Sequence, residues 1–65
     1  MKVYAIKRVL YDETWYLSTI NNKNWTRSPA DMFFFTDKGY AERTIKGWDK
    51  SLNLEVVAVR VVEDD

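Results

Sequence analysis

A chain of 65 residues has room for one domain and one small hydrophobic core. The absence of cysteine and histidine excludes a disulfide framework, a Cys nucleophile, a His-based acid–base pair and a zinc site built from these ligands. Ten Lys and Arg balance ten Asp and Glu. We therefore expect a single small domain over residues 1–65 that is not an enzyme and holds no cofactor or metal.

The first part of the chain predicts three strands. Residues 2–10 are rich in β-forming side chains and residues 14–20 alternate between two faces, so a polar turn at residues 11–13 joins them into a hairpin. The asparagine-rich residues 21–24 predict the next turn, because asparagine tolerates left-handed backbone and bonds to its own chain. Residues 25–27 are then expected to form a brief returning strand.

The middle of the chain predicts a single helical turn and then one amphipathic helix. Ser28 followed by Pro29 fits an N-cap with proline at the first helical position. Residues 32–35 predict either a short apolar strand or a buried extended link. The helix is expected over residues 36–50 with Thr36 as its N-cap.

One apolar stripe identifies the core-facing side of this helix. Its members follow one another at spacings of four, three and four residues: Ala41, Ile45, Trp48 and Leu52. Trp48 is accordingly interpreted as a core residue. Gly47 is interpreted as a site of close backbone approach rather than as the end of the helix.

The last strand is predicted over residues 54–62, followed by a frayed acidic tail at residues 63–65. Both of its faces are apolar, which is typical of a strand covered on two sides. The chain therefore predicts an α+β fold in ββ(β)αβ order. A mostly antiparallel sheet of three to four strands carries one helix on one face, with the last strand central or beside the first.

The second face of this sheet is the first candidate site. One helix covers only one side of a small sheet, so the apolar surplus needs another cover, which would be a partner protein or a second copy of the chain. The candidate interface residues are Tyr4, Ile6, Trp15, Tyr16, Val57 and Val59. The alternative is that residues 25–35, with their four aromatic side chains, fold over this face.

A basic and aromatic region in residues 7–27 is the second candidate site. Residues 1–30 carry a net charge of +3 and residues 51–65 a net charge of −3. Aromatic rings among cations hold single-stranded nucleic acid by stacking and phosphate contacts. The candidate contact residues are Lys7, Arg8, Lys23, Trp25 and Arg27. The alternative is that Trp25 is core, the cations are solvated, and the two oppositely charged ends of the chain lie side by side.

Two strings of the sequence, residues 1–7 (MKVYAIK) and 33–41 (FFFTDKGYA), resemble small proteins of unknown function encoded by staphylococcal phages and prophages. The resemblance covers nearly the whole chain, but it brings no catalytic or binding residue with it. It implies expression inside a bacterial host cell.

Together these observations lead to a functional hypothesis. We expect a cytoplasmic, non-enzymatic interaction module that binds a host or phage protein, or a second copy of itself, through an exposed sheet face. A weak nucleic-acid binder is the alternative. No secretion signal and no apolar run of about 20 residues is present, so no membrane partner is expected.

Overall fold

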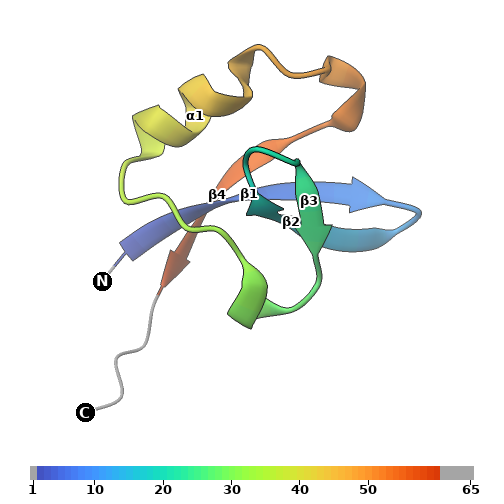
Figure 1. The fold of residues 1–65 in the computed structure, drawn as a ribbon, viewed down its shortest axis with the longest axis horizontal. Helices are drawn as coiled ribbons and strands as arrows, with labels where there is room; N and C mark the ends of the chain where they lie inside the picture. Colours follow the sequence, from blue (N-terminus) through green and yellow to red (C-terminus); the bar gives the residue numbers. More distant parts are fainter. Residues whose placement is uncertain (1, 61–65) are drawn as a thin grey trace.

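The computed structural model describes residues 2–60, without the side chain of Arg60, and it confirms the α+β class. The elements in chain order are β1 (Lys2–Leu10), β2 (Glu13–Thr19), β3 (Asn24–Thr26), the 3-10 turn η1 (Pro29–Asp31), α1 (Lys38–Lys46), the 3-10 turn η2 (Lys50–Leu52) and β4 (Glu55–Arg60). The strands form one antiparallel sheet in the order β3-β2-β1-β4. Helix α1 packs on one side of this sheet, against β1 and β4 (Figure 1).

The central strands β1 and β2 separate from each other along part of their length. They pair only from Lys7 opposite Tyr16 to the closed end of the hairpin. Beyond that point, residues 33–35 take the place of a neighbouring strand. The N–H of Phe33 donates to the carbonyl of Leu17 in β2, and the backbone of Phe35 exchanges two hydrogen bonds of 2.7 and 2.8 Å with Tyr4 in β1. The predicted extended link therefore lies in the plane of the sheet.

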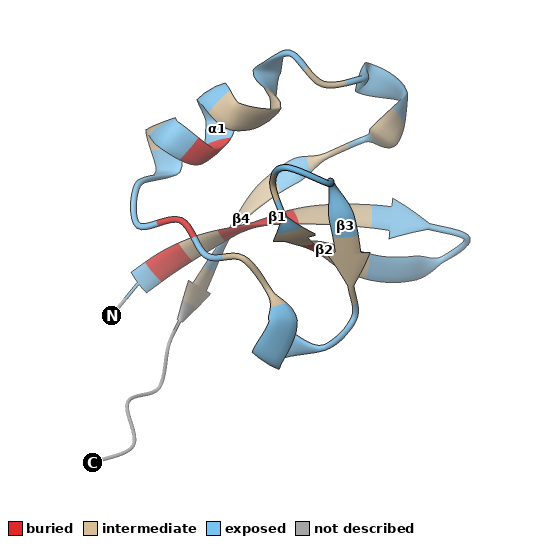
Figure 2. Cartoon of the chain, in the orientation of Figure 1, coloured by how far each residue is buried: buried red, intermediate tan, exposed pale blue. Residues whose placement is uncertain are grey.

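The core lies between α1 and the sheet. Residues directly opposite each other in antiparallel strands project to the same side, so the helix side carries Tyr4, Ile6 and Arg8 of β1. The buried members of the core are Ile6, Leu17, Phe35 and Ala41. Further apolar side chains pack around them, among them Trp25, Phe33, Trp48 and Val56. Figure 2 shows the buried positions gathered along the first half of β1 and its neighbours, whereas the closed end of the β1–β2 hairpin is exposed.

Helix α1 is shorter at both ends than the sequence predicted. Asp37, not Thr36, is the N-cap, and its carboxylate accepts hydrogen bonds from the backbone N–H groups of Gly39 and Tyr40. The helix ends at Lys46, and Gly47 is the C-cap. A Cβ added to Gly47 would meet no atom of the described chain within 4 Å, so the expectation of close backbone approach was wrong.

Trp48, the stripe residue just beyond Gly47, nevertheless packs against the core as predicted, whereas Leu52 is half-buried and is not among the described residues that pack against it. Trp48 follows the helix in a turn, with its backbone N–H donating to Ile45, and its ring packs against the core. Leu52 lies in η2, where the carboxylate of Asp49 accepts from the N–H of Ser51 and this bond lowers the pKa of Asp49. Successive short turns thus keep a helix-like spacing without a continuous helix.

The N-cap gives a paired test of the helix start. Asp37→Ala is expected to lower the free energy of unfolding by about 1 kcal/mol, because two N–H groups of the first turn lose their acceptor. Thr36→Ala, one residue earlier, is expected to change it by less than about 0.5 kcal/mol. Urea denaturation followed by circular dichroism measures both. Equal losses in the two variants would contradict the assignment of Asp37.

Strand β4 lies at an edge of the sheet beside β1, one of the two positions that the sequence left open. This pairing brings the basic first part of the chain next to the last strand, where the ammonium group of Lys7 lies 4.0 Å from the carboxylate of Glu55. The predicted continuation through Val61 and Val62 and the acidic tail at residues 63–65 lie outside the described residues.

Candidate functional site

The six residues predicted for a protein interface divide between the two sides of the sheet. Tyr4, Ile6 and Trp15 project to the helix side, and Ile6 is fully buried there. The pairing of Lys7 with Tyr16 and of Ala5 with Val57 places Tyr16, Val57 and Val59 on the opposite side, where all three are half-buried. The structure therefore gathers only the second group on the face away from the helix.

The centre of that second face is shielded from solvent. Val3 and Ala5 occupy it on the central strand β1, and they are only 4% and 0% exposed. The aromatic side chains of residues 25–35 do not all lie on this side, because Phe35 belongs to the buried core on the helix side of the sheet, and Trp25 and Phe33 are partly buried against it. Their neighbour Phe34 is exposed.

All three tryptophans carry a cation over the ring. The guanidinium of Arg8 lies 5.5 Å from the ring centre of Trp25, and that of Arg27 lies 5.7 Å from Trp15. The ammonium of Lys23 lies 4.9 Å from Trp48. We call these six residues the Trp–cation surface: Arg8, Trp15, Lys23, Trp25, Arg27 and Trp48.

The strand register explains how this surface forms. Arg8 is paired directly with Trp15, and Trp25 of β3 is paired with Leu17, so these side chains share the helix side of the sheet. Lys23 comes from the β2–β3 turn, where its φ of 50° marks a left-handed backbone. Trp48 is added by the turn that follows α1. Segments far apart in sequence therefore supply one surface.

Four of the five predicted nucleic-acid residues belong to this surface, although Trp25 also packs against the core, as the alternative interpretation expected. Lys7 projects to the opposite face, because neighbouring residues of a strand alternate in direction, and there it faces Glu55. Sequence reasoning had assigned Trp15 to a protein interface and Trp48 to the helical core. The predicted three-residue turn at residues 11–13 would have paired Arg8 with Tyr16, whereas the observed two-residue loop pairs it with Trp15. The approach of Trp48 was not predicted either.

The electrostatic character of the surface is positive. Its three cations are accompanied by one acidic contact, from Glu13 to Arg27 at 3.5 Å, between side chains that are both about half exposed. Exposed ion pairs of this kind contribute little to stability. The indole Nε1 of Trp15 is buried and has no hydrogen-bond acceptor among residues 2–60.

The tip of the β1–β2 hairpin carries an exposed apolar patch beside this surface. Tyr11 is 91% exposed, and its strand neighbours Val9 and Leu10 are exposed as well. Tyr11 and Asp12 form the two-residue loop with φ values of 51° and 64°. Positive φ at both positions is the geometry of a type I′ turn, which asparagine and glycine adopt most easily.

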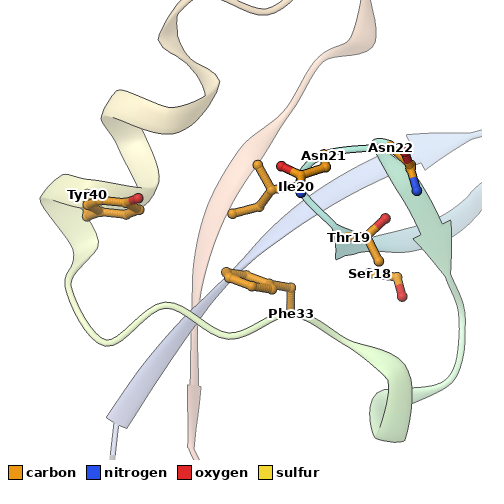
Figure 3. Close-up of a pocket in the computed structure, with 7 residues that line it drawn as sticks. All are labelled: Ser18, Thr19, Ile20, Asn21, Asn22, Phe33 and Tyr40. Atoms are coloured by element: carbon orange, nitrogen blue, oxygen red, sulfur yellow. The ribbon is translucent and has the colours of Figure 1, made fainter.

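An open pocket of about 500 Å³ lies at the other end of β2. Its lining is uncharged and consists of Ser18, Thr19, Ile20, Asn21, Asn22, Phe33 and Tyr40. Figure 3 shows Tyr40 coming from α1 and the polar residues coming from the end of β2 and the following turn, with Phe33 on the link that precedes the helix. The next residue after Asn22 is Lys23 of the Trp–cation surface.

The search of residues 2–60 for two further kinds of feature gives negative results. No group of three or more Asp and Glu side chains there is arranged to hold a metal ion. No helix within residues 2–60 is long and apolar enough to cross a membrane. Comparisons of the chain with protein families, with curated proteins and with solved structures find no match.

Proposed function

We propose that this chain is a non-enzymatic protein that binds single-stranded nucleic acid through the Trp–cation surface. The observation that carries the proposal is the gathering of three tryptophans and three cations, from four separate segments, on one side of the fold. The resemblance to phage and prophage proteins supports the cytoplasm of a bacterial host cell as its place of action.

The chemistry of the surface suits a strand whose bases are unpaired. Aromatic rings provide stacking partners for bases of any sequence, at about 1–3 kcal/mol per base. Guanidinium and ammonium groups neutralise the phosphates between them. A cation already held over a ring is also preorganised, since its long side chain loses little further freedom when a phosphate arrives.

The salt dependence of binding tests this proposal. A fluorescently labelled short oligothymidylate is expected to bind, and its affinity is expected to fall with salt at a log–log slope of about −2. This slope follows from three phosphate contacts at about 0.7 each for a single strand. Binding is also expected to quench the tryptophan fluorescence, because the rings lie at the contact.

Two charge-matched variants make the test specific. Arg8→Ala with Arg27→Ala is expected to weaken binding at least about tenfold at low salt and to reduce the slope to about −0.7. Lys38→Ala with Lys46→Ala removes the same charge from exposed positions of α1 and is expected to leave binding nearly unchanged. Equal weakening in both pairs, or no binding by the parent chain, would refute the proposal.

A second candidate function is docking of a host or phage protein on the hairpin tip. The observation in its favour is the exposure of Val9, Leu10 and Tyr11 at the end of a projecting hairpin (Figure 1). Apolar docking persists at high salt, whereas phosphate contacts weaken steeply. A bacterial protein captured at high salt by the parent chain but lost with Tyr11→Ser would favour this function. Capture by both chains alike would count against the tip.

A further inference from the structure

We propose that bases of the bound strand stack on the guanidinium planes of Arg8 and Arg27, each of which rests on a tryptophan ring. The inference rests on the proposed binding of single-stranded nucleic acid and deepens it by naming the side chains that meet the bases. Three observations carry it: the partial burial of the two rings, the position of a guanidinium over each of them, and the placement of both arginines on one side of the sheet.

The two indole rings offer only part of their surface to a base. Trp25 is half-buried and packs against the core, and Trp15 is half-buried with its Nε1 atom out of contact with solvent. The guanidinium carbon of Arg8 lies 5.5 Å from the ring centre of Trp25, and that of Arg27 lies 5.7 Å from the ring centre of Trp15. A base that arrives from solvent therefore meets a guanidinium at each ring.

A guanidinium over a ring extends the stacking surface of that ring. The group is planar and delocalised, so that it stacks on an aromatic face with one side and keeps its other side for a base. Unpaired bases stack on guanidinium planes as they do on aromatic rings. The ammonium of Lys23, which lies over Trp48, has no such plane and is expected to contact phosphates alone. The three cations therefore differ in role although they carry the same charge.

The edge of a guanidinium serves phosphate while its face serves a base. Its N–H groups point outward in the plane of the group, so an acidic partner binds the edge rather than the face. The Nη1 atom of Arg27 lies 3.5 Å from the carboxylate of Glu13, and the arginine side chain is still 60% exposed. A phosphate that replaces Glu13 leaves the face of Arg27 to a base. Stacking is therefore compatible with the phosphate contacts that set the salt slope.

The strand register places both arginines beside one tryptophan. Arg8 of β1 is paired directly with Trp15 of β2, and Arg27 follows Thr26, whose partner in β2 is Tyr16. The next position along the chain brings Arg27 beside Trp15, in agreement with the contact between them. The two arginines therefore start from opposite sides of β2 and share the helix side of the sheet, which puts two stacking planes on the same side of the fold.

Exchange of arginine for lysine tests the inference, because it keeps the charge and removes the plane. Arg8→Lys with Arg27→Lys is expected to weaken the binding of a labelled oligothymidylate at least about fivefold, while the log–log salt slope stays near about −2. An abasic oligonucleotide of equal length, which has phosphates but no bases, is expected to bind the parent chain and this variant alike. Circular dichroism melts confirm that both chains are folded.

The chain also offers a matched control and the converse substitution. Arg43→Lys makes the same exchange at an exposed position of α1 and is expected to leave the affinity for oligothymidylate unchanged. Lys23→Arg adds a plane over Trp48 and is expected to tighten the binding of oligothymidylate about threefold or more, with no effect on the abasic strand.

The outcomes separate this inference from the proposed function. If the parent chain binds oligothymidylate and the double lysine variant binds it equally well, stacking on the guanidiniums is refuted and the Trp–cation surface stands. Equal weakening of the abasic strand would also overturn the inference, because the exchange would then act on phosphate contacts. If the parent chain binds no oligonucleotide, both proposals fail.

Discussion

Phe35→Ala is expected to leave much of the protein unfolded at 25 °C. Removing a buried phenylalanine ring costs about 3–5 kcal/mol through lost apolar burial and the cavity left behind. A chain of this length has a total stability of roughly 3–10 kcal/mol. Phe35 is 3% exposed, belongs to the buried core, and contacts the rings of both Phe33 and Tyr40. Its loss therefore removes support from the core and the pocket together.

The preceding residue provides the control for this prediction. Phe34 is 39% exposed, and Phe34→Ala is expected to cost less than about 1 kcal/mol because the same ring is removed from a largely solvated position. Urea denaturation monitored by tryptophan fluorescence and by circular dichroism compares the two variants. Similar stabilities of the two variants would contradict the placement of Phe35, rather than Phe34, in the core.

Replacing the hairpin tip by Asn-Gly is expected to stabilise the protein by about 1–2 kcal/mol. Tyr11 and Asp12 both have positive φ, and a left-handed backbone costs an ordinary residue roughly 1–2 kcal/mol. Asparagine at position 11 and glycine at position 12 adopt this turn with little strain. Because Tyr11 is almost fully exposed, the double substitution sacrifices no packing. The midpoint of urea unfolding is expected to rise.

A control at the same turn separates backbone strain from side-chain chemistry. Tyr11→Ala with Asp12→Ala shortens both side chains without relieving the left-handed backbone, and it is expected to give no stabilisation. A gain equal to that of the Asn-Gly variant would show that the strain argument is wrong. Strained backbone is common at functional sites, so the same variants also bear on docking at the hairpin tip.

The strands were predictable because each follows a local pattern. Alternation and turn residues place β1, β2 and β3 within one or two residues of their observed bounds. The end of α1 was not predictable from periodicity, since Trp48 and Leu52 keep the spacing of a helix while lying in successive short turns. The apolar spacing correctly predicted that Trp48 faces the core, but it could not show that the backbone there is no longer helical.

The candidate site was only partly predictable, even where it depends on one hairpin. Alternation separates Lys7 from Arg8, but the predicted turn at residues 11–13 would have paired Arg8 with Tyr16, and only the observed two-residue loop brings Trp15 opposite Arg8. The contact between Lys23 and Trp48 joins the β2–β3 turn to the turn after the helix. No local pattern encodes such a contact, because it depends on how the helix lies across the sheet. The pocket depends on the same packing and was not anticipated.

The pairing of β1 with β4 has a consequence for how the protein is made. The six paired positions join segments about fifty residues apart along the chain, and loop closure of this length slows folding. During synthesis β1 emerges well before β4, so the central strand β1 has no partner on that side until β4 has been made. We therefore expect the pairing of β1 with β4 to form later than the local β1–β2 hairpin, and until then this side of β1 presents unpaired backbone groups to other strands.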